Sequence, residues 1–329
     1  EVYVNGFSTS LPADVQEKAL RTVPGLEKAH IIRLGYAVEY DFFPSYQLHP
    51  TLETRPVNNL YFAGQINGTS GYEEAAAQGL MAGINAALKL LDRPPLALDR
   101  SEAYIGVLID DLINKTILEP YRMFTSRAEF RLLLRHDNAD LRLMEKGYRV
   151  GLLPEPVYEK MLRRKEEIAR LSEQIRSTSI VPESFNEYAE RIGTAPIKIS
   201  TPMQQLLKRP EVKLVDLLQL AGIPTEAYSS STLTEVEFTT KYDGFLRRQQ
   251  ELVEKFKRME NALIPESIDY SQIPSLSAES REKLSQVRPR SIGQAARISG
   301  VRQSDLAILM VYVEKHNRTS RNVSRETLV

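Results

Sequence analysis

Apolar and polar positions follow different periods along the chain, and these periods predict different kinds of structure. Residues 1–99 combine short apolar runs and turns with one long helical pattern that begins at Tyr72 and stops before Pro94 and Pro95. From Ser101 onward, apolar residues recur every three or four positions, which is typical of amphipathic helices. We expect helices over 104–117, 126–135, 155–175, 212–220, 235–263, 278–287, 292–299 and 304–315, with an irregular connection over 178–201.

These patterns predict an α/β portion followed by helical regions. The expected domains are residues 1–99, residues 100–228 and residues 229–329. No internal repeat is apparent, and no apolar segment reaches the length of a membrane span.

The most informative segment is a glycine-rich turn between an apolar run and a helix. Residues 60–63 have the length and composition of a strand, and three glycines with Asn67 permit positive φ in the turn. Free N–H groups at the start of the helix would face a ligand. Because Glu73 and Glu74 would oppose a phosphate, we expect the turn to meet an uncharged group. From the spacing alone, an ordinary strand-to-helix connection is equally compatible.

The literal sequence of residues 59–79 closely resembles the flavin fingerprint of the GidA/MnmG family, FAD-dependent enzymes that modify the wobble uridine of tRNA together with the GTPase MnmE. Four further blocks are similar to the same family: residues 6–12, 37–41, 119–135 and 292–301. The resemblance implies the C-terminal part of such an enzyme. The implied fold class is an incomplete Rossmann-like α/β FAD-binding domain followed by all-α C-terminal domains.

The resemblance also implies an activity. The complete enzyme would add a (carboxymethyl)aminomethyl group to carbon 5 of the wobble uridine, with FAD, NADH as electron donor and a folate one-carbon donor. Its partners would be MnmE, the tRNA anticodon arm and a second copy of itself. One alternative is a non-catalytic module that only binds MnmE and tRNA. Another is the related folate- and FAD-dependent tRNA uracil-5-methyltransferase, which lacks the long helical C-terminus found here.

Composition restricts the chemistry further. The 329 residues carry 43 Lys and Arg and 43 Asp and Glu, so the net charge is zero, and there is no cysteine. Disulfides, thiolate metal sites and thiol nucleophiles are therefore excluded within this sequence, which is consistent with the cytoplasm. No G-x-G-x-x-G motif and no initiator methionine open the chain. We expect the chain to begin within a fold, with half of the flavin site outside it, and to be inactive alone.

The flavin contacts are expected at the glycine turn, where backbone donors and an amide can reach carbonyl and hydroxyl oxygens. Gln65 is the strongest candidate, and Tyr46, Gln47 and Leu52 are weaker flavin neighbours. The expected cofactor-binding residues are Gly64, Gln65, Asn67, Gly68, Thr69, Gly71 and Tyr72.

Arginines recur every four residues in the helix expected over 126–135, and would form one basic stripe. A stripe alone favours a solvated surface paired with acidic neighbours, but membership in a tRNA-modifying family favours phosphate contact. Lys115 is a secondary candidate. The expected tRNA-binding residues are Arg122, Arg127, Arg131 and Arg135.

The C-terminal region has a local excess of basic residues, with ten Lys and Arg against four Asp and Glu from Arg281 onward. Residues 292–301 with Leu306 and Leu309 have the spacing of a helix-turn-helix. Following the family, we assign this region to partner binding. The expected contacts are Arg288, Arg290, Arg297 and Arg302.

Other polar residues give no catalytic site. Asp110 and Asp111 are adjacent, and surface solvation is the expected role of the pair. The four histidines, His30, His49, His136 and His316, are isolated, and no metal-ligand spacing occurs. The catalytic residues therefore stay unassigned.

Overall fold

Two compact units make up the chain, residues Glu1–Phe42 and Phe43–Val329. No helix in the described part of the chain is long and apolar enough to cross a membrane. The structure, a computed structural model, describes residues 1–36, 40–115, 119–302, 304–313 and 315.

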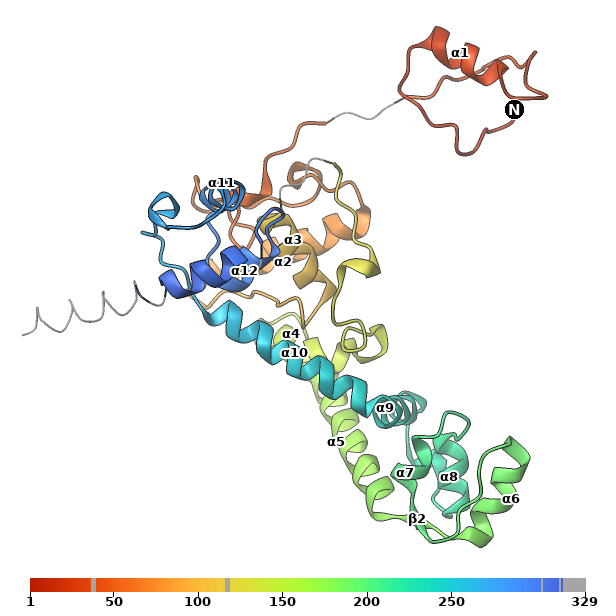
Figure 1. The fold of residues 1–329 in the computed structure, drawn as a ribbon. Helices are drawn as coiled ribbons and strands as arrows, with labels where there is room; N and C mark the ends of the chain where they lie inside the picture. Colours follow the sequence, from red (N-terminus) through yellow and green to blue (C-terminus); the bar gives the residue numbers. More distant parts are fainter. Residues whose placement is uncertain (37–39, 116–118, 303, 314, 316–329) are drawn as a thin grey trace, which may run out of the picture. The chain divides into compact units, whose positions relative to one another are not determined.

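The first unit is built around helix α1, Ala13–Arg21 (Figure 1). The buried Gln16 side chain holds its loops together, because it donates to the carbonyl oxygens of Leu11 (2.6 Å) and Gly35 (3.0 Å) and accepts from the Gly35 N–H (2.8 Å). The side chain of Gln16 thus makes the hydrogen bonds to loop backbone groups that neighbouring backbone would make in regular secondary structure.

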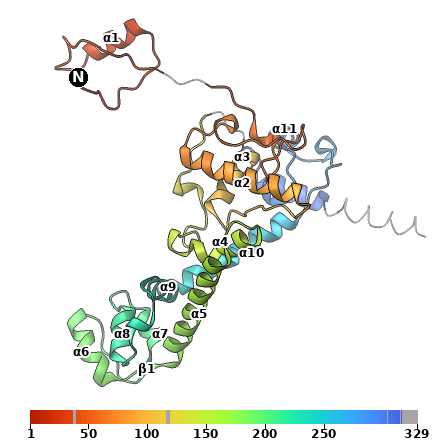
Figure 2. The ribbon, with the colours of Figure 1, turned by 180° about the vertical axis from the view of Figure 1, so that it is seen from behind.

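Helices α2, Tyr72–Leu90, and α3, Tyr104–Asn114, lie side by side at the start of the second unit (Figures 1 and 2). Their core includes Met81, Leu88 and Ile109. The strand expected over 60–63 is not formed: Tyr61 meets Glu53 only in an isolated antiparallel bridge. An apolar run becomes a strand only where a neighbour continues the pairing, and the described residues provide none here.

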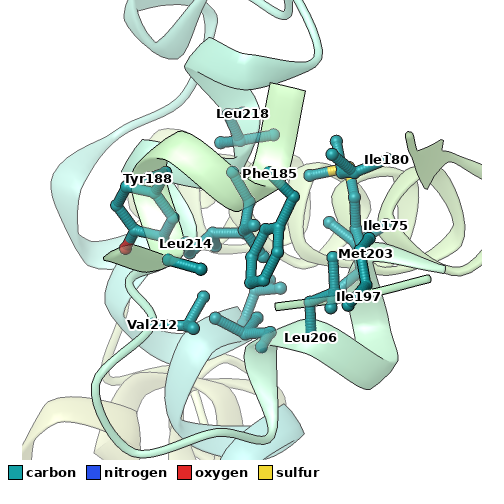
Figure 3. Close-up of a cluster of buried hydrophobic side chains, with 14 of the residues drawn as sticks. Ile175, Ile180, Phe185, Tyr188, Ile197, Met203, Leu206, Val212, Leu214 and Leu218 are labelled. Atoms are coloured by element: carbon teal, nitrogen blue, oxygen red, sulfur yellow. The ribbon is translucent and has the colours of Figure 1, made fainter. Parts of the chain in front are cut away.

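The helical middle region has its own apolar core (Figure 3). Figure 3 shows the ring of Phe185 among the side chains of Met203, Leu206 and Leu214, and all four residues are fully buried. Its elements are α4 Ala139–Arg149, α5 Glu155–Ser177, β1 Ser179–Ile180, α6 Pro182–Ile192, β2 Thr201–Pro202, α7 Met203–Leu207, α8 Leu214–Leu220 and α9 Ser230–Lys241.

Residues 178–201 were expected to be irregular, and that expectation is wrong. The segment contains β1 and helix α6, and β1 pairs antiparallel with β2. Pro182 occupies the first turn of α6, and Gly193 ends it in the left-handed conformation with φ of 72°. Proline and glycine at these two positions delimit a helix instead of breaking it.

The last helices form a second apolar core with Leu284, Ile292 and Leu309 at its centre. The helix expected over 278–287 is confirmed, whereas the one expected over 235–263 is divided at Tyr242 into α9 and α10. Helix α9 packs against α5, and α10 packs against α12, so the division lets one apolar sequence serve two cores. The elements are α10 Asp243–Asn261, α11 Ala278–Val287, α12 Ile292–Arg297 and a helical segment at 304–313.

Short 3-10 helices connect these elements. They are η1 Ser45–Gln47, η2 Gly64–Asn67, η3 Thr125–Arg127, η4 His136–Asn138, η5 Thr225–Ala227 and η6 Tyr270–Gln272.

Candidate functional site

The glycine turn leads into α2 as the sequence predicts, although a 3-10 helix, η2, occupies its first half. Gly64 and Gly68 have φ of 82° and 75°, a conformation that side-chain-bearing residues rarely adopt. A Cβ at Gly64 would also lie 3.2 Å from the Cβ of Ala75 in α2. The turn therefore needs glycine both for its backbone conformation and for its close approach to the helix.

A buried amide that sequence analysis missed holds this turn in place. Gln78, with no exposed surface, accepts hydrogen bonds from the Gly64 N–H (3.0 Å) and the Asn67 side chain (2.8 Å). It donates to the Thr69 hydroxyl (2.9 Å) and to the carbonyl oxygen of Glu74 (3.1 Å). A glutamine on the buried face of an otherwise alanine- and glycine-rich helix was the available signal.

The expected cofactor residues fall into three groups. Asn67 and Thr69 are each 1% exposed and bond within the turn, so their role in this structure is to support it. Gln65 and Tyr72 are exposed. Gly71 provides no side-chain cap for α2, and the Glu74 carboxylate lies beside this helix end, so the exposed amide of Gln65 is the donor that a ligand can reach. Gly64, Gly68 and Gly71 are buried, and so contribute backbone geometry.

The weaker flavin neighbours lie in the segment before the turn. Leu52 is fully buried in the apolar core below α2, which removes it from the surface that a ligand can contact. Tyr46 and Gln47 belong to η1 and are half-buried. Ser45 beside them donates a hydrogen bond to the Asn67 carbonyl oxygen (3.0 Å), so η1 supports the turn directly.

Glu74 places a buried negative charge at the start of α2. Its carboxylate accepts from the Met123 N–H (2.7 Å) and lies 3.4 Å from Nε of Arg122. Burial raises the pKa of Glu74, but the hydrogen bond from Met123 and the charge of Arg122 outweigh burial, and the net pKa is below its ordinary value. The carboxylate is therefore ionised at neutral pH, which favours an uncharged group over a phosphate at this helix end.

Residues 119–124 pack directly on the glycine turn. The Tyr121 N–H donates to the Gly68 carbonyl oxygen (2.8 Å), and Tyr121 pairs with Thr69 in a parallel bridge. With the bond from Met123 to Glu74, two consecutive contacts fix this segment against the turn. The two blocks expected to bind cofactor and tRNA are thus joined in one surface.

The helix expected over 126–135 is not formed, and this is a correction. Only η3 overlaps this range, and turns follow it until η4 begins at His136. A side chain from elsewhere takes a carbonyl group that a helix would need, because Arg100 donates to the Arg127 carbonyl (3.0 Å). Arg142 donates to the Arg135 carbonyl (3.0 Å) at the end of the range. Tertiary hydrogen bonds override the local helical preference.

The arginines expected on one stripe consequently have different surroundings. Arg127 lies with its guanidinium 4.4 Å from the ring centroid of Tyr121, and its Nε donates to the Arg122 carbonyl oxygen (2.8 Å). Arg131 is exposed. Arg122 is 54% exposed along its side chain. Arg122 and Arg131 remain open to a polyanion, whereas Arg127 is 33% exposed along its side chain and has Nη1 3.9 Å from Asp111.

Arg135 instead has an internal role. Its guanidinium forms an ion pair with Glu235 of α9, pairs with Asp137 at 2.9 Å, and lies 3.6 Å from the ring centroid of Phe238. Only 13% of the side chain is exposed. Arg135 therefore links the segment before η4 to α9, and we withdraw it from the phosphate contacts.

Asp110 and Asp111 are not solvated surface residues, contrary to the sequence expectation. Asp111 has no exposed surface, and Arg100 lies 2.6 Å from it and 3.0 Å from Asp110. Arg100 also pairs with Glu129 at 2.7 Å. Lys115 contacts Asp111 at 2.7 Å, so Lys115 belongs to this buried charge cluster and not to a free basic surface.

The cluster extends to the C-terminal helices through Arg297. This side chain, expected to contact a partner, contacts Asp110 of α3 at 2.7 Å and is 11% exposed. The helix-turn-helix expected here is formed by α12 and the segment 304–313, with Gly300 at φ of 93° in the turn. Three of the four predicted partner contacts are exposed: Arg288, Arg290 and Arg302.

The structure gives no candidate metal site among the residues that it describes. No group of three or more His, Asp or Glu residues there is arranged to hold a metal ion. His316 lies outside the described residues, as do residues 37–39 of one family-like block.

Three family models match the chain, and together they cover most of it. The model described as "Glucose inhibited division protein A" matches residues 1–94. Those described as the "tRNA modifying enzyme MnmG/GidA" C-terminal helical domain and C-terminal helical bundle match residues 155–250 and 252–328.

Curated relatives agree with these models. Proteins from Geobacillus kaustophilus and Thermodesulfovibrio yellowstonii, both named tRNA uridine 5-carboxymethylaminomethyl modification enzyme MnmG, are 53% and 54% identical over 316 and 317 residues. Each alignment covers 96% of this chain and 50% of the relative. The chain thus spans about half the length of the curated relatives it matches.

A solved structure supports the same relationship. The form II crystal structure of Aquifex aeolicus GidA is 42% identical, with a TM-score of 0.74 over 94% of this chain and 49% of that one. The expected fold class, part of an α/β FAD-binding domain followed by helical domains, is confirmed. The expected domain boundaries stay predictions.

Proposed function

Because the chain belongs to the GidA/MnmG family, we propose that it contributes the tRNA-facing and flavin-supporting half of an enzyme that adds a (carboxymethyl)aminomethyl group to carbon 5 of the wobble uridine. The observation that carries this proposal is the contact between the glycine turn and residues 119–124. That contact joins the start of α2 to the segment that carries the exposed Arg122 and leads into Arg127 and Arg131.

FAD is the cofactor that the turn fits. Its accessible donor is the exposed amide of Gln65, which suits the carbonyl and hydroxyl oxygens of a flavin. Asn67 Oδ1 is buried without a hydrogen-bond partner, so the turn also keeps an unused acceptor. The ionised Glu74 argues that the pyrophosphate is held by other residues.

Bound FAD would supply redox chemistry on the one-carbon adduct, with NADH and a folate as donors. The residues of this chain would support the glycine turn and orient the bound RNA. Gln78 fixes the turn, and the bond from Met123 to Glu74 holds residues 119–124 beside it. Arg122, Arg127 and Arg131 neutralise phosphates of the anticodon arm.

The C-terminal bundle is proposed to bind the GTPase MnmE, with the complete enzyme acting as a homodimer. The exposed arginines at 288, 290 and 302 support a contact with an acidic surface, whereas Arg297 is committed to Asp110. The partner contact would therefore lie on the solvent side of the helix-turn-helix.

The proposed function predicts the nucleoside composition of tRNA. In a bacterial strain that lacks its own MnmG, the complete enzyme containing this chain should restore the modified wobble uridine, and the purified protein should show flavin absorption. The measurement is mass spectrometry of digested tRNA, with the empty vector as control. Unmodified tRNA from cells that contain the soluble flavoprotein would contradict the proposal.

The exposed Arg131 provides a second prediction. Arg131→Glu should weaken binding of the anticodon arm and reduce the slope of log affinity against log salt by about 1 or more, because a phosphate contact releases counterions. Arg163→Glu on α5, where the arginine is 64% exposed, is the matched control. Titrations over a range of salt concentrations would measure both slopes, and equal slopes would remove Arg131 from the contact surface.

A further inference from the structure

Phe124 is an exposed aromatic side chain on a segment that is otherwise firmly held. Its exposed fraction is 59%, although the two residues before it, Arg122 and Met123, both contact Glu74 of α2. Tyr121 of the same segment is 3% exposed and donates its hydroxyl to Asp111 (3.0 Å). The segment thus buries one aromatic ring and presents the other to solvent. An aromatic ring held outward on a fixed backbone loses little conformational freedom when a ligand stacks on it.

The charges around Phe124 suit an anionic ligand with a flat ring. The Arg127 guanidinium lies 5.9 Å from the Phe124 ring centroid, and the Arg122 side chain is half exposed beside it. Of the nearby carboxylates, Asp111 is paired with Arg100 and Lys115, and Glu74 is buried below the segment and accepts the Met123 N–H. Aromatic rings flanked by arginine are the common surface on which proteins bind unpaired nucleotides.

The position of this ring relative to the turn is set by hydrogen bonds. Met123, next to Phe124, donates to Glu74 in the first turn of α2, within two residues of Tyr72. A nucleotide stacked on Phe124 would therefore lie beside the helix end at which the flavin is proposed to bind. A base that is taken out of an RNA loop must lie close to the reacting atoms before it can be modified.

We propose that Phe124 is the stacking platform for an unpaired base of the anticodon loop, with Arg122 and Arg127 neutralising the adjacent phosphates. This inference rests on the proposed function and adds the residue that receives the nucleotide. It commits this surface to single-stranded RNA. The alternative is that a protein segment, or another part of the same enzyme, covers the ring. The experiment must be able to detect this.

The test compares two exposed phenylalanines in the complete flavoprotein. Phe124→Ala is set against Phe245→Ala on α10, where the ring is 58% exposed, and against the conservative Phe124→Trp. Two RNA probes are used: an anticodon stem-loop with uridine at the wobble position, and the same stem-loop with an abasic wobble position. Flavin content and oligomeric state are measured for every variant.

Stacking predicts a specific pattern. Phe124→Ala should weaken binding of the uridine stem-loop by roughly 5- to 150-fold, the usual effect of removing one base-stacking ring. The same change should leave the affinity for the abasic stem-loop nearly unaltered. Phe124→Trp should retain binding, and Phe245→Ala should behave as the unmodified protein. Flavin content should stay constant throughout.

Other outcomes separate the two proposals. If the unmodified enzyme does not distinguish the anticodon stem-loop from an unrelated hairpin, the proposed function fails. If it does, but Phe124→Ala binds both probes as tightly as the unmodified enzyme does, or weakens binding of both probes by the same factor, the stacking proposal is overturned. Loss of flavin or a changed oligomeric state in Phe124→Ala would also overturn it, because the ring would then be a structural contact.

Discussion

Replacing Arg100 with alanine should lower the free energy of unfolding by about 3 kcal/mol, because the change removes the centre of a buried charge cluster. Arg100 pairs with Asp110, Asp111 and Glu129, and it is 8% exposed. Without it, Asp111 keeps Lys115 but loses its shortest ion pair. The Asp111 carboxylate stays buried away from water, and fewer ion pairs then compensate for its loss of hydration.

The loss should depend on pH. Burial raises the pKa of Asp111, but the hydrogen bond from Lys115 and the charge of Arg100 outweigh it, so the pKa in the folded protein is below the ordinary value. Asp111 therefore stabilises the fold above the unfolded pKa of about 3.9, and this contribution disappears as the pH falls through the folded pKa. The deficit of Arg100→Ala should shrink in the same range, where Asp111 becomes protonated.

Urea unfolding at a series of pH values measures both effects. Arg247→Ala is the matched control, because this arginine forms an ion pair with Asp243 but is 73% exposed, and exposed pairs contribute about 0–1 kcal/mol. Equal losses for the two variants at neutral pH would show that the Arg100 cluster is not a stabilising centre.

Gln78→Leu should lower the free energy of unfolding by about 3 kcal/mol and remove bound flavin, although leucine has nearly the volume of glutamine. The side chain makes four hydrogen bonds to the turn and to α2. Leucine would leave the buried Gly64 N–H and the Asn67 side-chain amide without acceptors, and Thr69 would keep only its bond to the Gly64 carbonyl oxygen. The positive-φ turn would then lose the contacts that compensate for its unfavourable backbone.

Gln65→Ala separates support of the turn from contact with the cofactor. Gln65 is exposed and should change stability by no more than about 0.5 kcal/mol, while flavin affinity falls. Urea midpoints and the flavin-to-protein absorbance ratio measure the two properties for each variant. A Gln78→Leu protein that is stable and keeps its full content of bound flavin would show that other contacts hold the turn.

Several elements could be predicted because their causes are local. The glycines at 64 and 68 adopt the positive φ that only glycine reaches easily, and helix α2 begins at the expected Tyr72. Helix α11 has the expected bounds, and Ser277 caps it by accepting the Ser280 N–H. Residue type, period and capping chemistry are sufficient for such features.

Segments whose backbone groups bond to distant side chains could not be predicted. Residues 126–135 have helical spacing, yet Arg100 takes the Arg127 carbonyl that a helix would use. The break at Tyr242 likewise depends on which core each half of the sequence joins, because α9 packs on α5 and α10 on α12. No window of neighbouring residues contains that information.

The sequence by itself determined the family, the glycine turn and the approximate extent of most helices, since these depend on short-range conformational preference and on a long shared sequence pattern. Only the tertiary structure decided which charges face solvent. Arg135 and Arg297 have the composition of surface residues but are enclosed by partners far away in the chain, and Asp111 is enclosed by Arg100 before α3 and Lys115 at its end. Burial and pairing are properties of the packed molecule, because the energy of a charge depends on what surrounds it in three dimensions.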